Sequence, residues 1–278
     1  MDERPPSKTA FEVAVLRALH QRIETPKVFD DPYAIRILGS KGEEVIAAAA
    51  SNAARTARLR AGVVARSRIA EDTVAQAVSR GVRQYVLLGA GLDTYAYRNT
   101  VPDLRIFEVD QPATQAWKRA LAHDAALAPP PGLAYAAVEF GRHALDEALR
   151  VAGFRFDRPA VFAALGVVPY VAQSDFVATL RIVASVPDAE IVFDYPEPFV
   201  AAAPPVRAAY EAITKRASAS GEPWISFFTP DEIGGELRGL GFLEISDLGT
   251  VELNARYFGG RSDGFVAAPL IHILQARR

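Results

Sequence analysis

Short apolar segments alternate with helical segments through most of this chain, and this alternation constrains the fold more than any other feature. Each apolar segment is only a few residues long and apolar throughout, which is typical of strands buried on both faces of a parallel sheet. Helical stretches lie between them, at 111–128, 141–153 and 173–186. Strand alternating with helix predicts an α/β fold whose sheet is covered by helices. The predicted strands are 84–91, 105–110, 133–140, 159–168, 189–196, 243–249 and 269–276.

The first 80 residues have the pattern of helices. Apolar residues recur at helical spacing in 10–23. A short helix is predicted over 30–39 and an Ala-rich helix over 42–62, which Gly62 would end. The chain shows no repeat or linker, so we interpret it as one domain, with a helical N-terminal extension or lid at 1–80 and a core at 81–278.

The first predicted strand ends in Gly89-Ala90-Gly91, and Asp93 lies two positions later. Glycines at a strand end let the backbone approach a ligand closely, because no Cβ intervenes. The next strand ends in Asp110, where a carboxylate can accept hydrogen bonds from both ribose hydroxyls. The pattern predicts an adenosine-containing cofactor, and a plain strand-end turn is the simpler alternative.

The residues after the glycine turn indicate which cofactor binds. A dinucleotide fingerprint would have a third glycine where this chain has Thr94. Asp93 would repel a pyrophosphate but not a cationic sulfonium. The turn has no Walker lysine after it, which disfavours an ATP site. S-adenosylmethionine (SAM) fits best. An NAD(P)-dependent oxidoreductase with an irregular fingerprint and a non-catalytic SAM-binding protein are the alternatives.

Several motifs together resemble one protein family. The stretch ARSRIAEDTVAQAVSRGVRQYVLLGAGLDTYAYR, followed by FEVDQP, is similar to the leucine carboxyl methyltransferase family. The closer likeness is to its bacterial branch of SAM-dependent O-methyltransferases, which includes polyketide carboxyl O-methyltransferases. FDDPYAIRILG, LGVVPYV, FDYPEP and GRSDGF also match, so the likeness extends from about residue 10 to 275.

The resemblance implies a class I SAM-dependent methyltransferase fold, which is Rossmann-like, with a seven-stranded, mostly parallel sheet whose last strand, 269–276, is antiparallel. It implies that Arg66 grips the carboxylate of the cofactor, with Arg68 as the neighbouring candidate, and that Asp110 holds the ribose. Leu165 stands where some members of the family have an acid, so the role of that acid is not carried over. The product would be S-adenosylhomocysteine. The predicted cofactor site comprises Arg66, Gly89, Ala90, Gly91, Asp93, Asp110, Gln111, Glu139, Phe140, Leu165 and Gly166.

Methyl transfer from a sulfonium needs mainly alignment of the two reactants. A carboxylate acceptor is already ionised, whereas a hydroxyl would need a general base. Tyr195 is the predicted acceptor-facing residue, because it ends the fifth strand, and Tyr170 has a similar position after the fourth. WISFF at 224–228 would either line an apolar substrate pocket or belong to the core. None of the four histidines lies in a catalytic motif, and no metal site is predicted.

Composition sets the remaining expectations. The net charge of −2 gives no basic field for nucleic acid, so the predicted partner is a small-molecule methyl acceptor. No apolar run reaches the roughly 20 residues of a membrane helix. The absence of cysteine fits a reducing, cytoplasmic compartment. The sequence leaves monomer and homodimer open.

Overall fold

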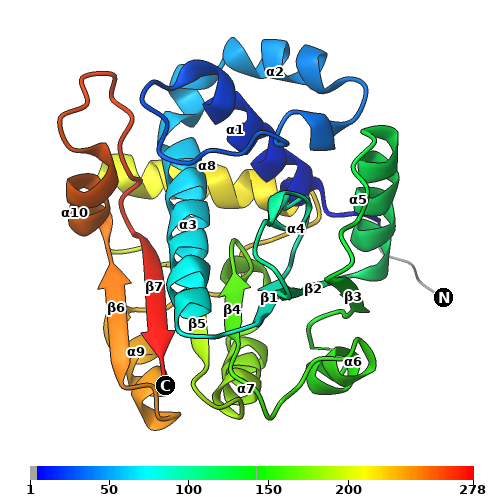
Figure 1. The fold of residues 1–278 in the computed structure, drawn as a ribbon. Helices are drawn as coiled ribbons and strands as arrows, with labels where there is room; N and C mark the ends of the chain where they lie inside the picture. Colours follow the sequence, from blue (N-terminus) through cyan, green and yellow to red (C-terminus); the bar gives the residue numbers. More distant parts are fainter. Residues whose placement is uncertain (1–4, 142) are drawn as a thin grey trace.

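A computed structural model describes residues 5–141 and 143–278. The described residues form a seven-stranded sheet in the order β3-β2-β1-β4-β5-β7-β6 (Figure 1). Strand β7 runs opposite to the other six, so that it is antiparallel to both of its neighbours, β5 and β6. All seven predicted strands are present, and the antiparallel last strand is confirmed. The strands are β1 (Gln84–Leu88), β2 (Arg105–Asp110), β3 (Leu133–Ala137), β4 (Val161–Ala164), β5 (Glu190–Pro196), β6 (Glu244–Leu248) and β7 (Ile271–Arg277).

Helices cover both faces of the sheet, and α1 and α2 lie beyond the ends of its central strands (Figure 1). The α-helices are α1 (Lys8–Ile23), α2 (Gly42–Ala50), α3 (Ala53–Ser79), α4 (Tyr95–Arg98), α5 (Pro112–Asp124), α6 (Leu145–Val151), α7 (Gln173–Ala184), α8 (Pro204–Ala219), α9 (Pro230–Gly239) and α10 (Thr250–Leu253). Two short 3-10 helices, η1 (Arg36–Leu38) and η2 (Val168–Tyr170), and one π-helical turn, η3 (Asn254–Phe258), complete the fold.

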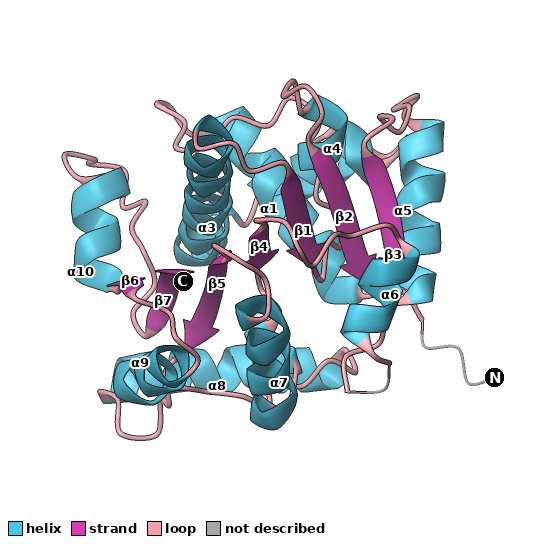
Figure 2. Cartoon of the chain, turned by 60° about the horizontal axis from the view of Figure 1, so that its bottom comes forward, coloured by secondary structure: helices cyan, strands magenta, loops and turns pink. Residues whose placement is uncertain are grey.

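Alternate residues of each strand point to opposite faces of the sheet. In β1, Val86 and Leu88 pack in a buried cluster with α6, α7 and α9, whereas Tyr85 and Leu87 pack on the other face with α3 and α10. Figure 2 shows α3 on one side of the sheet and α7 and α9 on the other. Burial on both faces explains why these strands are apolar throughout.

A third cluster joins the N-terminal helices to the edge of the core. Leu19 of α1 and Ile46 of α2 are buried together with Ala122 of α5. The predicted extension therefore packs against the rest of the chain, and α3 forms part of the main core. The division at residue 80 remains a prediction.

The predicted helix end at Gly62 is wrong. The break falls earlier, at Ser51–Asn52, and α3 continues through Gly62 to Ser79. Residues on both sides of Gly62, namely Ala61, Val63 and Val64, are almost fully buried. Burying an apolar helix face stabilises the helix by more than the roughly 1 kcal/mol that one interior glycine costs. The helix predicted over 30–39 is instead a turn followed by η1.

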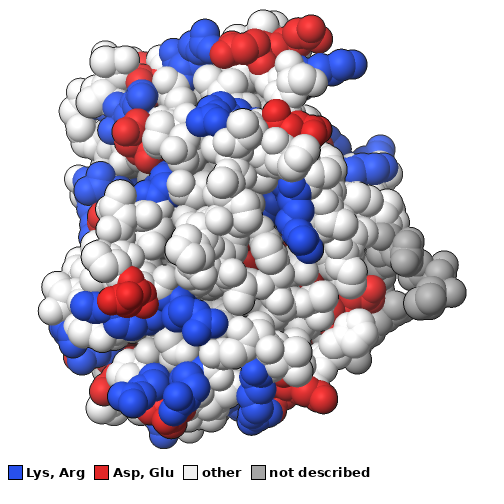
Figure 3. Space-filling view, turned by 45° about the vertical axis from the view of Figure 1, so that its right-hand side comes forward, with Lys and Arg blue, Asp and Glu red and all other residues white. Residues whose placement is uncertain are grey.

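Charged side chains of both signs are interspersed on the face drawn in Figure 3, with neutral surface between them. No band of one sign crosses that face. Within the described ranges, none of the helices combines the length and apolar character needed to span a membrane.

Candidate functional site

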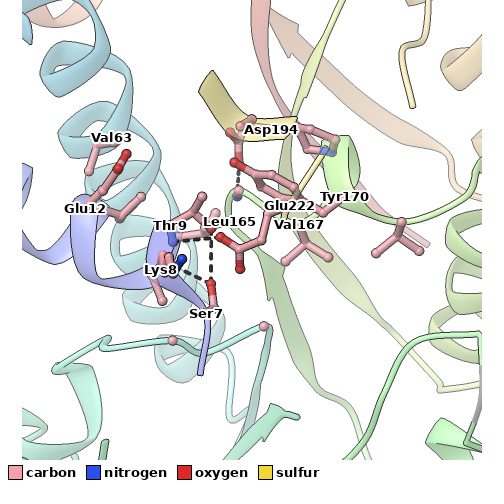
Figure 4. Close-up of a pocket in the computed structure, with 18 of the residues that line it drawn as sticks. Ser7, Lys8, Thr9, Glu12, Val63, Leu165, Val167, Tyr170, Asp194 and Glu222 are labelled. Carbon is pink, nitrogen blue, oxygen red and sulfur yellow. Dashed lines mark hydrogen bonds between the residues drawn. The ribbon is translucent and has the colours of Figure 1, made fainter. Parts of the chain in front are cut away.

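One large cavity, of about 970 Å³, lies at the carboxyl ends of the central strands. Its walls come from the ends of β1, β2, β3, β4 and β5, from α1 and α3, and from the end of α8 with the segment after it. Figure 4 shows Val63 and Glu12 on one side of this cavity and Tyr170 and Glu222 on the other. Every residue of the predicted cofactor site lines this cavity, and Tyr195 does not.

The Gly89–Gly91 turn forms part of the cavity wall. Both glycines have left-handed backbone, with φ of 65° and 48°, a region that favours glycine. A Cβ on Gly89 would lie 2.5 Å from Cγ2 of Val167, and one on Gly91 would lie 3.1 Å from Cβ of Ala10. The fold therefore requires glycine at position 89, and the start of α1 lies close above position 91.

Asp110 lies at the end of β2, beside this turn. Its Oδ2 accepts a hydrogen bond from the Gly91 N–H at 2.7 Å, and its Oδ1 accepts one from the Gln111 N–H at 2.7 Å. Burial raises the pKa of Asp110, and these two N–H donors oppose the rise without cancelling it. Each carboxylate oxygen has a second lone pair, so Asp110 can still accept hydrogen bonds from two hydroxyl groups.

Arg66 reaches from α3 to the end of β4. Its Nη1 lies 2.7 Å from Oδ2 of Asp194, and its guanidinium lies against Gly166, where a Cβ would be 2.7 Å from Nη2. Both side chains are nearly buried. A guanidinium has five N–H donors, so Arg66 retains donors for a carboxylate in the cavity.

Arg68 has a different environment from Arg66. It is half exposed and pairs with Asp72 one turn along α3, at 2.9 Å. It is not among the residues that line the cavity. Of the two candidate arginines, the structure places only Arg66 at the site.

Asp93 lines the cavity, but its charge is already balanced by the protein. Its Oδ2 lies 3.1 Å from Nη1 of Arg17, and its Oδ1 accepts the Tyr95 N–H at 2.7 Å. Burial opposes ionisation, yet Arg17, Lys118 and Arg98 outweigh it and hold the pKa of Asp93 below its usual value. Asp93 therefore adds little net negative charge to the cavity.

Glu139 and Phe140 follow β3 after one intervening residue, Val138, and are half buried at the cavity wall. The Glu139 N–H donates to Nδ1 of His143 at 3.1 Å. Leu165 and Gly166 come directly after β4, and Gly166 has a φ of 71°. The ends of the three neighbouring strands β1, β2 and β3 therefore line the cavity together with the end of β4.

The expectation that Tyr195 faces the acceptor is wrong. Its side chain is fully buried, and its hydroxyl donates to Oδ2 of Asp247 at 2.5 Å. Its ring stacks on His272, at 5.1 Å between centroids. Because neighbouring strand residues point to opposite faces, Asp194 faces the cavity and Tyr195 faces away from it.

Two histidines, His20 and His272, are held by carboxylates within the fold. His20 is buried and pairs with Glu24 at 2.9 Å, and His272 lies between Asp247 and Glu197, 2.9 Å from each. His123 is exposed. Among the described residues, no group of three or more His, Cys, Asp or Glu is arranged to hold a metal ion.

Several residues that line the cavity are not in the predicted site. Asp194 is next to Tyr195 in FDYPEP, and an acid near the end of the fifth strand could have been predicted to lie at the site. Glu222 accepts the Thr9 N–H at 2.9 Å, and no local pattern indicates that contact. Of WISFF, Trp224 and Ile225 line the cavity, whereas Phe228 is in the core.

Comparison with known proteins places this site in a family. Residues 10–184 match the leucine carboxyl methyltransferase family. A Bacillus subtilis protein, named "Putative S-adenosyl-L-methionine-dependent methyltransferase YktD", is 30% identical over 302 aligned positions that cover 99% of each chain. A similarly named protein of Mycolicibacterium gilvum is 34% identical over 177 positions, covering 58% of this chain and 57% of that relative.

Solved structures have the same fold. A protein from Thermobifida fusca, described as "a putative methyltransferase", superposes with a TM-score of 0.61 at 18% identity, covering all of this chain and 96% of that one. A duf574 family protein from Streptomyces avermitilis gives 0.61 at 17% identity, covering 96% and 97%. The matched residues and the full-length relative lead to one conclusion: this chain belongs to the leucine carboxyl methyltransferase family.

Proposed function

We propose that this methyltransferase uses SAM to methylate an oxygen, carboxylate or hydroxyl, of a small molecule such as a polyketide or another secondary metabolite. One observation carries the proposal. The residues predicted from the sequence to bind SAM come from β1, β2, β3, β4 and α3, and all of them line a single cavity. The NAD(P)-dependent alternative has no comparable support, because the family is one of methyltransferases.

The residues present fit SAM. Asp110 has free lone pairs for the ribose hydroxyls, and Arg66 has free donors for the amino-acid carboxylate. Gly89 and Gly91 leave the backbone open to the cavity. Glu139 would accept a hydrogen bond from the adenine amino group, and the backbone of Phe140 would contact the adenine ring. SAM would supply a methyl group already activated on a sulfonium. The protein's task is then to fix the acceptor oxygen in line with that methyl group.

Our preference is for an acceptor that is already ionised. Among the described residues, none of the histidines lines it. Burial raises the pKa of the nearby Tyr170 hydroxyl, so that group is a poor base at neutral pH. A carboxylate acceptor needs no base, and we therefore favour a carboxylate over a hydroxyl.

We also propose that the partner is a small molecule rather than nucleic acid or a membrane, and that the protein acts in the cytoplasm as a monomer or homodimer. The mixed charges on the face in Figure 3 support the first part, because protein surfaces that bind nucleic acid are predominantly basic.

Isothermal titration calorimetry tests the cofactor. We expect SAM and S-adenosylhomocysteine to bind with dissociation constants on the order of micromolar or tighter, and NAD(H) to give no heat. Tight NAD(H) binding without SAM binding would overturn the proposal. Binding of SAM with no methyl transfer to any carboxylic acid or hydroxyl compound supplied would favour the non-catalytic alternative.

A further inference from the structure

Gly62 occupies an unusual place for a glycine. It lies in the interior of the 27-residue helix α3, where glycine destabilises relative to alanine. Its backbone is not left-handed, and a Cβ built on it would meet nothing within 4 Å. Neither backbone conformation nor packing therefore requires glycine at this position.

The open space beside Gly62 belongs to the cavity. Gly62 lines it from α3, on the same helix as Arg66 one turn away. Leu59 and Ile225, which also line it, are 39% and 56% exposed, although exposure of large apolar side chains to water is unfavourable. Glu12, Arg58 and Arg216 line the cavity from α1, α3 and α8. Apolar side chains from the same three helices and from the segment after α8 also line it: Val13, Leu59, Val63, Ile213, Ala217 and Ile225.

This aliphatic part, which we call the helix-side compartment and define by those six residues, differs from the strand-side part of the cavity. The strand-side part carries Asp93, Asp110 and Glu139 and presents backbone N–H groups at its glycine turn. Polar groups there suit the hydroxyls and charges of a nucleoside. The helix-side compartment suits an apolar body.

We propose that Gly62 keeps the helix-side compartment open for the apolar body of the methyl acceptor, and thereby sets the largest acceptor that the enzyme accepts. The acceptor class is an apolar carboxylic acid whose body lies along α3 between Leu59 and Val63. This inference rests on the proposed function, because it assigns the strand-side part of the cavity to SAM. The absence of a side chain at Gly62 therefore determines which acceptors fit.

The chain offers a matched control. Gly235 also lies in the interior of a helix, α9, has no left-handed φ and would meet nothing within 4 Å with a Cβ. It is exposed and does not line the cavity. Gly62→Leu and Gly235→Leu should both keep or raise Tm, because leucine is a better helix former than glycine.

The experiment measures binding of 8-anilinonaphthalene-1-sulfonate, an apolar organic anion, by fluorescence titration with and without saturating S-adenosylhomocysteine. Wild type and G235L should bind it saturably. G62L should bind it about tenfold more weakly or worse, because a leucine side chain would fill space that the probe needs. Calorimetric affinity for S-adenosylhomocysteine should be equal in all three proteins.

Two results would overturn the inference: no saturable binding of the probe to wild type, or equal binding to wild type and G62L. Failure of the proposed function looks different. In that case S-adenosylhomocysteine gives no heat with wild type, while the probe titration without it still shows whether Gly62 controls the compartment.

Discussion

Asp194 joins Arg66 to the turn after β4. Its Oδ2 lies 2.7 Å from Nη1 of Arg66, and its Oδ1 accepts the Gly166 N–H at 2.6 Å. One carboxylate thus fixes both a helix side chain and a strand-end backbone at the cavity wall. Asp194 is therefore a positioning residue for the arginine that we assign to the cofactor carboxylate.

Asp194→Asn keeps the shape of this side chain and removes its charge. We expect affinity for S-adenosylhomocysteine to fall by about 1–3 kcal/mol, the range for a lost hydrogen bond to a charged group. Isothermal titration calorimetry measures it. Asp72→Asn is the control on the same helix, because Asp72 pairs with the half-exposed Arg68 away from the cavity, and its effect should stay below about 0.5 kcal/mol. Equal effects of the two variants would remove Asp194 from the site.

Asp110→Ala tests the ribose contact. The variant removes the acceptor of the Gly91 N–H as well as the proposed acceptor of the ribose hydroxyls. We expect binding of S-adenosylhomocysteine to weaken by roughly 1–3 kcal/mol, as measured by calorimetry. Thermal unfolding of the same protein shows whether the turn has been disrupted. An unchanged affinity would mean that Asp110 does not hold the cofactor.

The strands could be predicted because burial on both sheet faces makes each one a short apolar run, and all seven are confirmed. The start of α9 could also be predicted. Thr229 and Glu232 form a capping box, a motif that depends only on neighbouring residues. The continuation of α3 through Gly62 could not be predicted, because the burial of Ala61 and Val64 comes from distant parts of the chain.

In the site, too, features set by local sequence could be predicted, and contacts between distant residues could not. Asp110 and the Gly89–Gly91 turn lie in one cavity because strand ends of a parallel sheet meet at one edge. Glu222 could not be anticipated, because it reaches the cavity through a contact with Thr9, more than 200 residues away in sequence. Tyr195 was placed on the wrong face because the sequence shows alternation but not which face of β5 meets the cavity.

Tyr195→Phe tests this correction. The phenol donates to Asp247 in a nearly buried position, so its removal should lower the free energy of unfolding by about 1–2 kcal/mol, measured by urea denaturation. Affinity for S-adenosylhomocysteine and methyl transfer should be unchanged. Loss of methyl transfer at wild-type stability would restore Tyr195 to the acceptor site.

His272 makes the stability of the protein depend on pH. Its ring nitrogens lie 2.9 Å from Asp247 and Glu197, and Tyr195 stacks on it. Burial opposes protonation, but the two carboxylates outweigh it and raise the pKa of His272 above its ordinary value of 6.5. A histidine whose pKa is raised by folding contributes stability that is full below its unfolded pKa and disappears as the pH rises through the folded pKa.

His272→Gln should therefore destabilise the protein most below pH 6.5, and the difference from wild type should shrink as the pH rises above that value. Urea denaturation at a series of pH values measures this. His123→Gln is the control, because the side chain of His123 is 90% exposed, and its effect should be small at every pH. A difference between H272Q and wild type that stays constant, or grows, with rising pH would show that the two carboxylates do not hold a proton on His272.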